Sequence, residues 1–161
     1  VSIQMSSKSY YEIALNDYRF LATIRDGDFY NKIGIECQQI AEKFLKYLYV
    51  TYIDVSEQEE RFIKTHSVHK IAIQLNKHLD TSFAYSSLAI LTDYYFDTRY
   101  PGDEYIDLTS DMASNALQLI DNLKAAVDEY IREHSGNCPI CGAKLLSTGG
   151  CCNINCLNTN S

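Results

Sequence analysis

Residues 29–52 decide the fold, and they read FYNKIGIECQQIAEKFLKYLYVTY. Apolar side chains recur there at steps of three and four, which is the period of a helix with one buried face. The buried stripe expected from this spacing is Ile33, Cys37, Ile40, Phe44 and Leu48. Glu42 and Lys46 lie four residues apart, so we expect them to pair on the solvent-facing side of this helix.

The same periodicity predicts helices on both sides of this stretch. They are expected over residues 9–25, 68–79, 84–95 and 109–135. Asp28 is well placed to cap the helix that begins at residue 29, and Gly136 to end the last one. The segment 54–60, which is rich in acidic residues, is expected to form a solvated loop. The pattern therefore predicts an all-α protein, an up-and-down bundle of about five helices.

The composition excludes several classes of protein. Only 7 glycines and 2 prolines occur in 161 residues, whereas an all-β domain needs turn residues at short intervals. Lys and Arg number 14 against 21 Asp and Glu, for a formal charge of −7, so a broad phosphate-binding surface is not expected. No apolar run is long enough to span a bilayer. We therefore expect an acidic, soluble, cytoplasmic protein without a membrane partner.

Five of the six cysteines lie in the last 24 residues. A disulfide framework would spread its cysteines to connect distant segments, whereas close pairs at one end are typical of a metal site. The segment Cys138-Pro-Ile-Cys141-Gly is typical of one half of a zinc ribbon. The other half is Cys152 with Cys156, or the alternate Cys151 with Cys156. Four thiolates would hold a structural Zn²⁺ and leave no position open for catalysis.

The cysteine-rich end is expected to form a second unit. We place a helical bundle at residues 1–135 and a zinc-ribbon-like tail at residues 136–161, close to the end of the last helix. The alternative, a redox CxxC pair, lacks the strand–helix context of thioredoxin-like proteins. The tail holds one charged residue, Lys144, and no aromatic residue, so protein docking or a structural role is expected in preference to nucleic-acid contact.

Three short motifs occur in order along the bundle. They are CQQIAEKFLK at residues 37–46, THSV at residues 65–68 and YYFDTRYPG at residues 94–102. Together they resemble the RYP-type branch of the HEPN family, helical domains named for higher eukaryotes and prokaryotic nucleotide-binding proteins. The resemblance covers about residues 9–134. It implies an up-and-down bundle that forms homodimers, and a role beside a minimal nucleotidyltransferase in toxin–antitoxin or defence systems.

A major branch of the same family consists of metal-independent ribonucleases, whose signature is Arg-x(4–6)-His. In such a site the histidine moves the proton of the 2′-hydroxyl and the arginine holds the phosphate. Here the positions that follow Arg99 at this spacing are Glu104, Tyr105 and Ile106. None of them can replace the histidine. Arg61 and His66 match the spacing elsewhere in the chain, before the third long helix, where the family does not place the pair.

The ligand-binding candidates that follow from the resemblance are Arg99, Tyr100, His66, Lys43 and Lys46. Arg99 has a structural alternative, an ion pair with a carboxylate such as Asp97 or Asp103, or hydrogen bonds to backbone carbonyls freed where Pro101 ends the helix. We expect no catalytic residues, and hence a non-catalytic module that binds a protein partner. One alternative is a ribonuclease toxin that uses Arg99 and His66 in a divergent site. The other is a nucleotide sensor, although the charge of the chain does not support a nucleotide or RNA partner.

Overall fold

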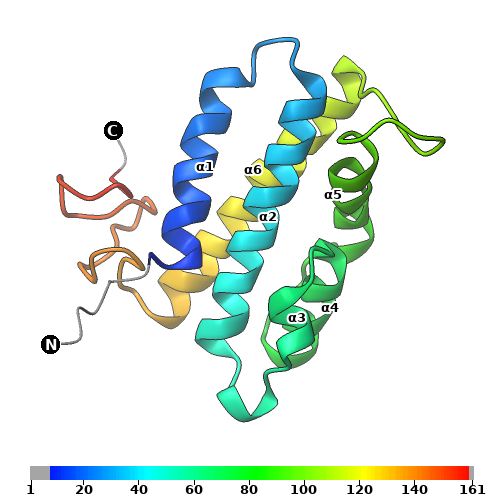
Figure 1. Ribbon diagram of the computed structural model, residues 1–161. Coiled ribbons are helices and arrows are strands. Elements are labelled where there is room, and N and C mark those ends of the chain that lie inside the picture. Colours follow the sequence, from blue (N-terminus) through cyan, green and yellow to red (C-terminus); the bar gives the residue numbers. More distant parts are fainter. Residues whose placement is uncertain (1–7, 160–161) are drawn as a thin grey trace, which may run out of the picture.

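The computed structural model describes residues 8–159, and within them the prediction of an all-α protein is confirmed (Figure 1). Two isolated β-bridges in the tail are the only extended pairing among these residues. No helix in this part of the chain combines the length and apolarity that a bilayer crossing requires. The helices are α1 (Tyr10–Ile24), α2 (Tyr30–Tyr52), the 3₁₀ turn η1 (Val55–Glu57), α3 (Glu60–Lys64), α4 (Val68–His78), α5 (Tyr85–Asp97) and α6 (Ser110–His134).

Helix α2 is the centre of the bundle and packs against all the other α-helices. In Figure 1, α1 lies to the left of α2, α6 crosses behind it, and α4 and α5 lie to its right. The stripe expected on α2, from Ile33 to Leu48, is buried along its whole length. The core therefore surrounds α2.

The ends of α1 and α6 follow local capping chemistry. The Ser9 hydroxyl accepts a hydrogen bond from the Glu12 backbone N–H, and the Thr109 hydroxyl accepts one from Met112. Each bond satisfies an N–H group that the first helical turn leaves free. Gly136 follows α6 with φ +71°, a left-handed conformation that glycine adopts without strain.

Two local expectations were wrong. Asp28 does not cap α2, because the N-cap position falls on Phe29, which makes no side-chain capping bond. The acidic segment is not wholly a loop, because it contains η1 and is followed by the short helix α3. The bundle therefore has six α-helices within residues 8–159, in place of about five.

The expected solvent-facing pair on α2 was also wrong. Glu42 is 8% exposed and Lys46 is 5% exposed, and Lys46 Nζ lies 2.6 Å from Glu42 Oε1. The two residues do pair at the expected spacing, but α2 has no solvent-facing side at this point because other helices pack around it.

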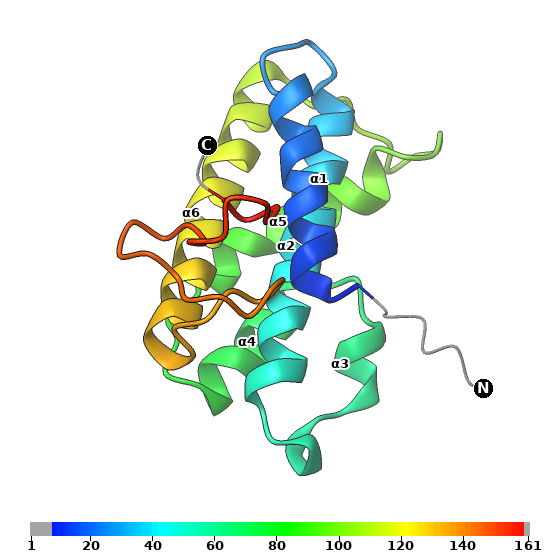
Figure 2. The ribbon, with the colours of Figure 1, turned by 90° about the vertical axis from the view of Figure 1, so that its left-hand side faces the viewer.

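The tail does not extend away from the bundle. Figure 2 shows it lying across α1 and α6, in orange and red. Cys138, Leu145 and Cys151 are buried in the same hydrophobic cluster as the helices. The tail thus packs on the bundle and does not stand apart from it.

Candidate functional sites

The first candidate site, called here the Arg99 face, consists of His66, Tyr95, Phe96, Arg99 and Tyr100. The Arg99 guanidinium carbon lies 4.4 Å from the centre of the Tyr95 ring and 5.4 Å from that of Tyr100. The His66 ring stacks on Tyr95 with 5.4 Å between ring centres, and Phe96 meets Tyr95 edge-on at 5.1 Å. A cation against aromatic rings is a favourable contact. The structure thus brings two of the candidate ligands, His66 and Arg99, onto the ring of Tyr95, and a third, Tyr100, against the Arg99 guanidinium.

His66 is held in place from α2. Its Nδ1 lies 3.2 Å from Glu42 Oε2, and its carbonyl oxygen accepts a hydrogen bond from Gln38 Nε2 at 3.0 Å. Gln38 also donates to Glu42 Oε2 at 2.8 Å. The buried carboxylate of Glu42 therefore joins Lys46, Gln38 and His66 in one polar network. Gln38 was not among the expected site residues, although it belongs to the CQQ motif.

Arg99 makes no ion pair with Asp97 or Asp103, and no ion pair within residues 8–159 includes it. Its contacts are the two tyrosine rings, which neither sequence interpretation anticipated. Lys43 does not join this face, because its ammonium group pairs with Asp17 of α1. Lys46 reaches the face only through Glu42.

The loop that follows Arg99 is fixed to the start of α2 by Asn31. The Asn31 side chain accepts a hydrogen bond from Leu108 N at 2.7 Å and donates to Asp107 Oδ1 at 3.1 Å. Tyr105 also donates to Asp107, at 2.7 Å. Asn31 was not an expected site residue, although it lies in the quoted stretch. Asp107 therefore has a structural role, and the Asn31 contacts hold the loop beside α2.

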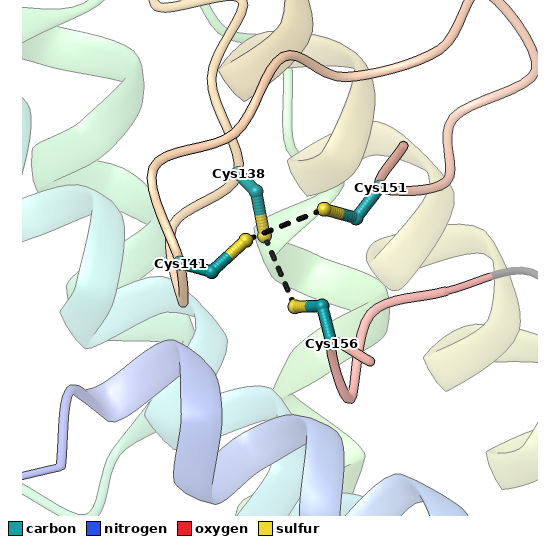
Figure 3. Close-up of side chains that lie close together, drawn as sticks. All are labelled: Cys138, Cys141, Cys151 and Cys156. Carbon is teal, nitrogen blue, oxygen red and sulfur yellow. Dashed lines mark hydrogen bonds between the residues drawn. The ribbon is translucent and has the colours of Figure 1, made fainter. Parts of the chain in front are cut away.

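The second candidate site is a cluster of four cysteines in the tail (Figure 3). Their sulfur atoms all lie within 4.8 Å of one another. Cys141 Sγ is 3.4 Å from Cys151 Sγ, and Cys138 Sγ is 3.7 Å from Cys156 Sγ. Four sulfurs placed ~2.3 Å from one tetrahedral ion would lie ~3.8 Å apart. The four thiols can therefore hold one metal ion.

The cluster contains Cys151 in place of the favoured Cys152. Cys151 is buried, with its Sγ among the other three sulfurs, and Cys152 is exposed. Cys151 forms an antiparallel bridge with Leu145, and successive side chains of an extended backbone point to opposite sides. One of two adjacent cysteines must then face away, and here it is Cys152.

Hydrogen bonds from N–H groups surround the sulfurs. Cys138 Sγ accepts from Ile140 N at 3.5 Å, and Cys151 Sγ accepts from Asn153 N at 3.4 Å. The backbone N–H of Ala143 lowers the pKa of Cys141 to about 7, whereas burial raises that of Cys151 to about 12. N–H donors favour the thiolate form that binds metals. The tail thus supplies the donors that a thiolate cluster needs.

The structure defines a class of protein: a helical bundle with a cationic and aromatic face, followed by a thiol-rich tail. The family model of the HEPN domain matches residues 7–130. The chain therefore belongs to the HEPN family, and residues 131–161 lie beyond that match. No curated protein and no solved structure matches the chain.

Proposed function

We propose that the chain is a non-catalytic binding module of the HEPN family, and that it partners a minimal nucleotidyltransferase in a toxin–antitoxin or defence system. The observation that carries the proposal is the environment of Arg99, whose guanidinium lies on Tyr95 and Tyr100. His66 makes no hydrogen bond or ion pair with Arg99; its partners are Gln38 and Glu42. Transfer of a ribose proton needs a histidine and a phosphate-binding cation that converge on one substrate.

The test of this function is co-expression of the chain with a minimal nucleotidyltransferase, taken from the neighbouring gene where that gene encodes one. The two proteins are expected to elute as one complex. Expression of the chain alone is expected to leave cell growth unchanged. Growth arrest that disappears in a His66→Ala variant would contradict the proposal.

A ribonuclease remains the second candidate because one observation favours it. His66 and Arg99 both contact the ring of Tyr95, and the His66 side chain is 51% exposed. A substrate that displaced Tyr95 would meet both groups. Direct measurement of RNA cleavage separates the two candidates.

A homodimer is the second part of the proposal, and α5 supports it. Leu88, Leu91 and Tyr94 face the core, while Ile90 and Phe96 are 42% and 55% exposed. The helix is thus apolar on its outer side as well. An isologous interface requires a self-complementary surface, and Arg99 lies beside Asp97 and close to Asp93 in the chain without pairing with either.

Replacing Phe96 with glutamate is therefore expected to convert a dimer into the 18.3 kDa monomer, because a charge in an apolar interface is desolvated without a partner. Sedimentation equilibrium measures the mass. Phe20→Glu on α1 is the matched control, since Phe20 is 45% exposed and lies on another face. A dimer that persists in the Phe96 variant would exclude α5 as the interface.

We also propose that the four thiols of Cys138, Cys141, Cys151 and Cys156 bind structural Zn²⁺. All-sulfur tetrahedral sites favour zinc, and four protein ligands leave no position for a substrate. The sulfur spacing and the N–H donors described above support this assignment. The ion would fix the fold of a segment that has only two isolated bridges of its own.

A further inference from the structure

Asn158 lies between the cysteine cluster and the bundle. It is 8% exposed, and its Nδ2 is 3.7 Å from Cys138 Sγ. The backbone carbonyl oxygen of Asn158 accepts a hydrogen bond from Cys151 N at 2.9 Å. Asn158 therefore contacts a cysteine from each half of the cluster, although it is not itself a thiol ligand.

The same side chain also faces the helices. Asn158 Oδ1 lies 3.4 Å from the hydroxyl of Tyr11, which donates to Asp128 Oδ1 of α6 at 2.7 Å. Tyr11 is 1% exposed, and burial together with Asp128 raises the pKa of its hydroxyl above the ordinary value. Asp128 is in turn paired with Lys124 at 2.5 Å. A continuous chain of polar contacts therefore runs from Cys138 to α1 and α6.

The seam between tail and helices is incompletely packed on both sides of Asn158. Two open clefts of about 450 and 390 Å³ border it, and Tyr18, Lys124 and Asn158 line both. Their other walls include charged side chains of α1 and α6. Water can therefore enter the seam at these clefts, while the contacts of Asn158 and the buried side chains of Cys138, Leu145 and Cys151 hold the tail on the bundle.

We propose that residues 136–159 form a metal-dependent clasp over α1 and α6, in which Asn158 is the positioning residue that couples the four thiols to Tyr11. The inference rests on the metal site of the proposed function. With an ion bound, the cysteine cluster places Asn158 against Tyr11 and closes the tail over this face. Without the ion the tail loses its main source of folding energy, and the face around Tyr11 becomes accessible to solvent or to a partner.

The coupling is reciprocal. Any contact that stabilises the closed tail also strengthens metal binding, because binding and closure are linked equilibria. Replacing a residue that hydrogen-bonds a metal ligand typically weakens metal binding about 10- to 100-fold. Asn158 occupies such a position relative to Cys138.

The first experiment measures zinc affinity of the full chain by competition with a chromophoric chelator. Asn158→Ala is expected to bind zinc about 10- to 100-fold more weakly than the unaltered chain. Asn155→Ala is the matched control, because Asn155 is an exposed asparagine of the same loop. Equal affinities in the two variants would overturn the positioning role.

The second experiment asks whether the bundle senses the ion. Hydrogen exchange of the α1 amides near Tyr11 is compared between the zinc-loaded and chelator-treated chains. Exchange there is expected to rise on chelation, while the centre of α2 stays protected. Tyr11→Phe is expected to weaken zinc binding, and Tyr10→Phe to leave it unchanged.

The outcomes separate this inference from the zinc assignment. A chain that takes up no zinc contradicts both. A second result would overturn the clasp alone. In that case the chain binds zinc tightly, but chelation does not raise hydrogen exchange in α1, and neither Tyr11→Phe nor Asn158→Ala weakens zinc binding.

Discussion

A chain in which Cys151 is replaced by serine is expected to bind almost no zinc, whereas the unaltered chain is expected to bind one ion. The Cys151 sulfur is one of four within 4.8 Å of each other, and three thiolates cannot close the tetrahedral site. Since metal binding supplies the folding energy of such a segment, the tail should also become sensitive to proteases. Metal analysis of the purified protein measures the first effect.

The matched control is Cys152→Ser. Cys152 is adjacent in sequence, but it is exposed and outside the cluster, so this variant should retain one zinc ion and a resistant tail. The reverse result, with zinc lost from the Cys152 variant and kept in the Cys151 variant, would contradict the ligand set.

Replacing Glu42 with alanine is expected to lower the free energy of unfolding by about 3–5 kcal/mol, the usual cost of breaking a buried ion pair. The change leaves the Lys46 ammonium, which is 5% exposed, without its carboxylate. It also removes the acceptor for Gln38 and His66. Urea denaturation followed by circular dichroism gives the value.

Glu60→Ala is the control, since Glu60 pairs with Lys64 at the same i,i+4 spacing on an exposed helix. Surface pairs contribute little, so this variant should unfold at nearly the urea concentration of the unaltered chain. A similar loss of stability in the two variants would contradict the burial of the Glu42–Lys46 ion pair on which this prediction rests.

The helices could be predicted because their signals are local. The apolar stripe of α2 lies where its spacing places it. The first and last long helices begin within one residue of the expected starts, and Gly136 ends the last one as its position indicated. These choices depend on a few neighbouring residues and on no distant contact.

The rest depended on packing that periodicity does not encode. An i,i+4 charge pair has the same pattern on a solvent-facing helix as on one that is surrounded, so the burial of Glu42 and Lys46 followed only from the position of α2. Helix α3, with five residues, is too short to show a period. Phe29 takes the capping position because the loop before α2 ends one residue later than the aspartate signal implied.

The candidate sites divide in the same way. The spacing of Cys138 and Cys141 indicated half of a metal site, but the choice between Cys151 and Cys152 depends on which side of an extended segment faces the cluster. Likewise the sequence offered carboxylates as partners for Arg99, whereas the fold placed Tyr95 within 4.4 Å of its guanidinium. When several residues near in sequence could each fill the same role, tertiary contacts decide which of them does.

The proposal that the chain has no ribonuclease activity is tested most directly by incubating the purified full chain with fluorophore-labelled single-stranded RNA. We expect no cleavage above that of a protein-free control, and identical traces for the unaltered chain, His66→Ala and Arg99→Ala. Cleavage by the unaltered chain that disappears in both variants would contradict the account and identify the Arg99 face as a ribonuclease site.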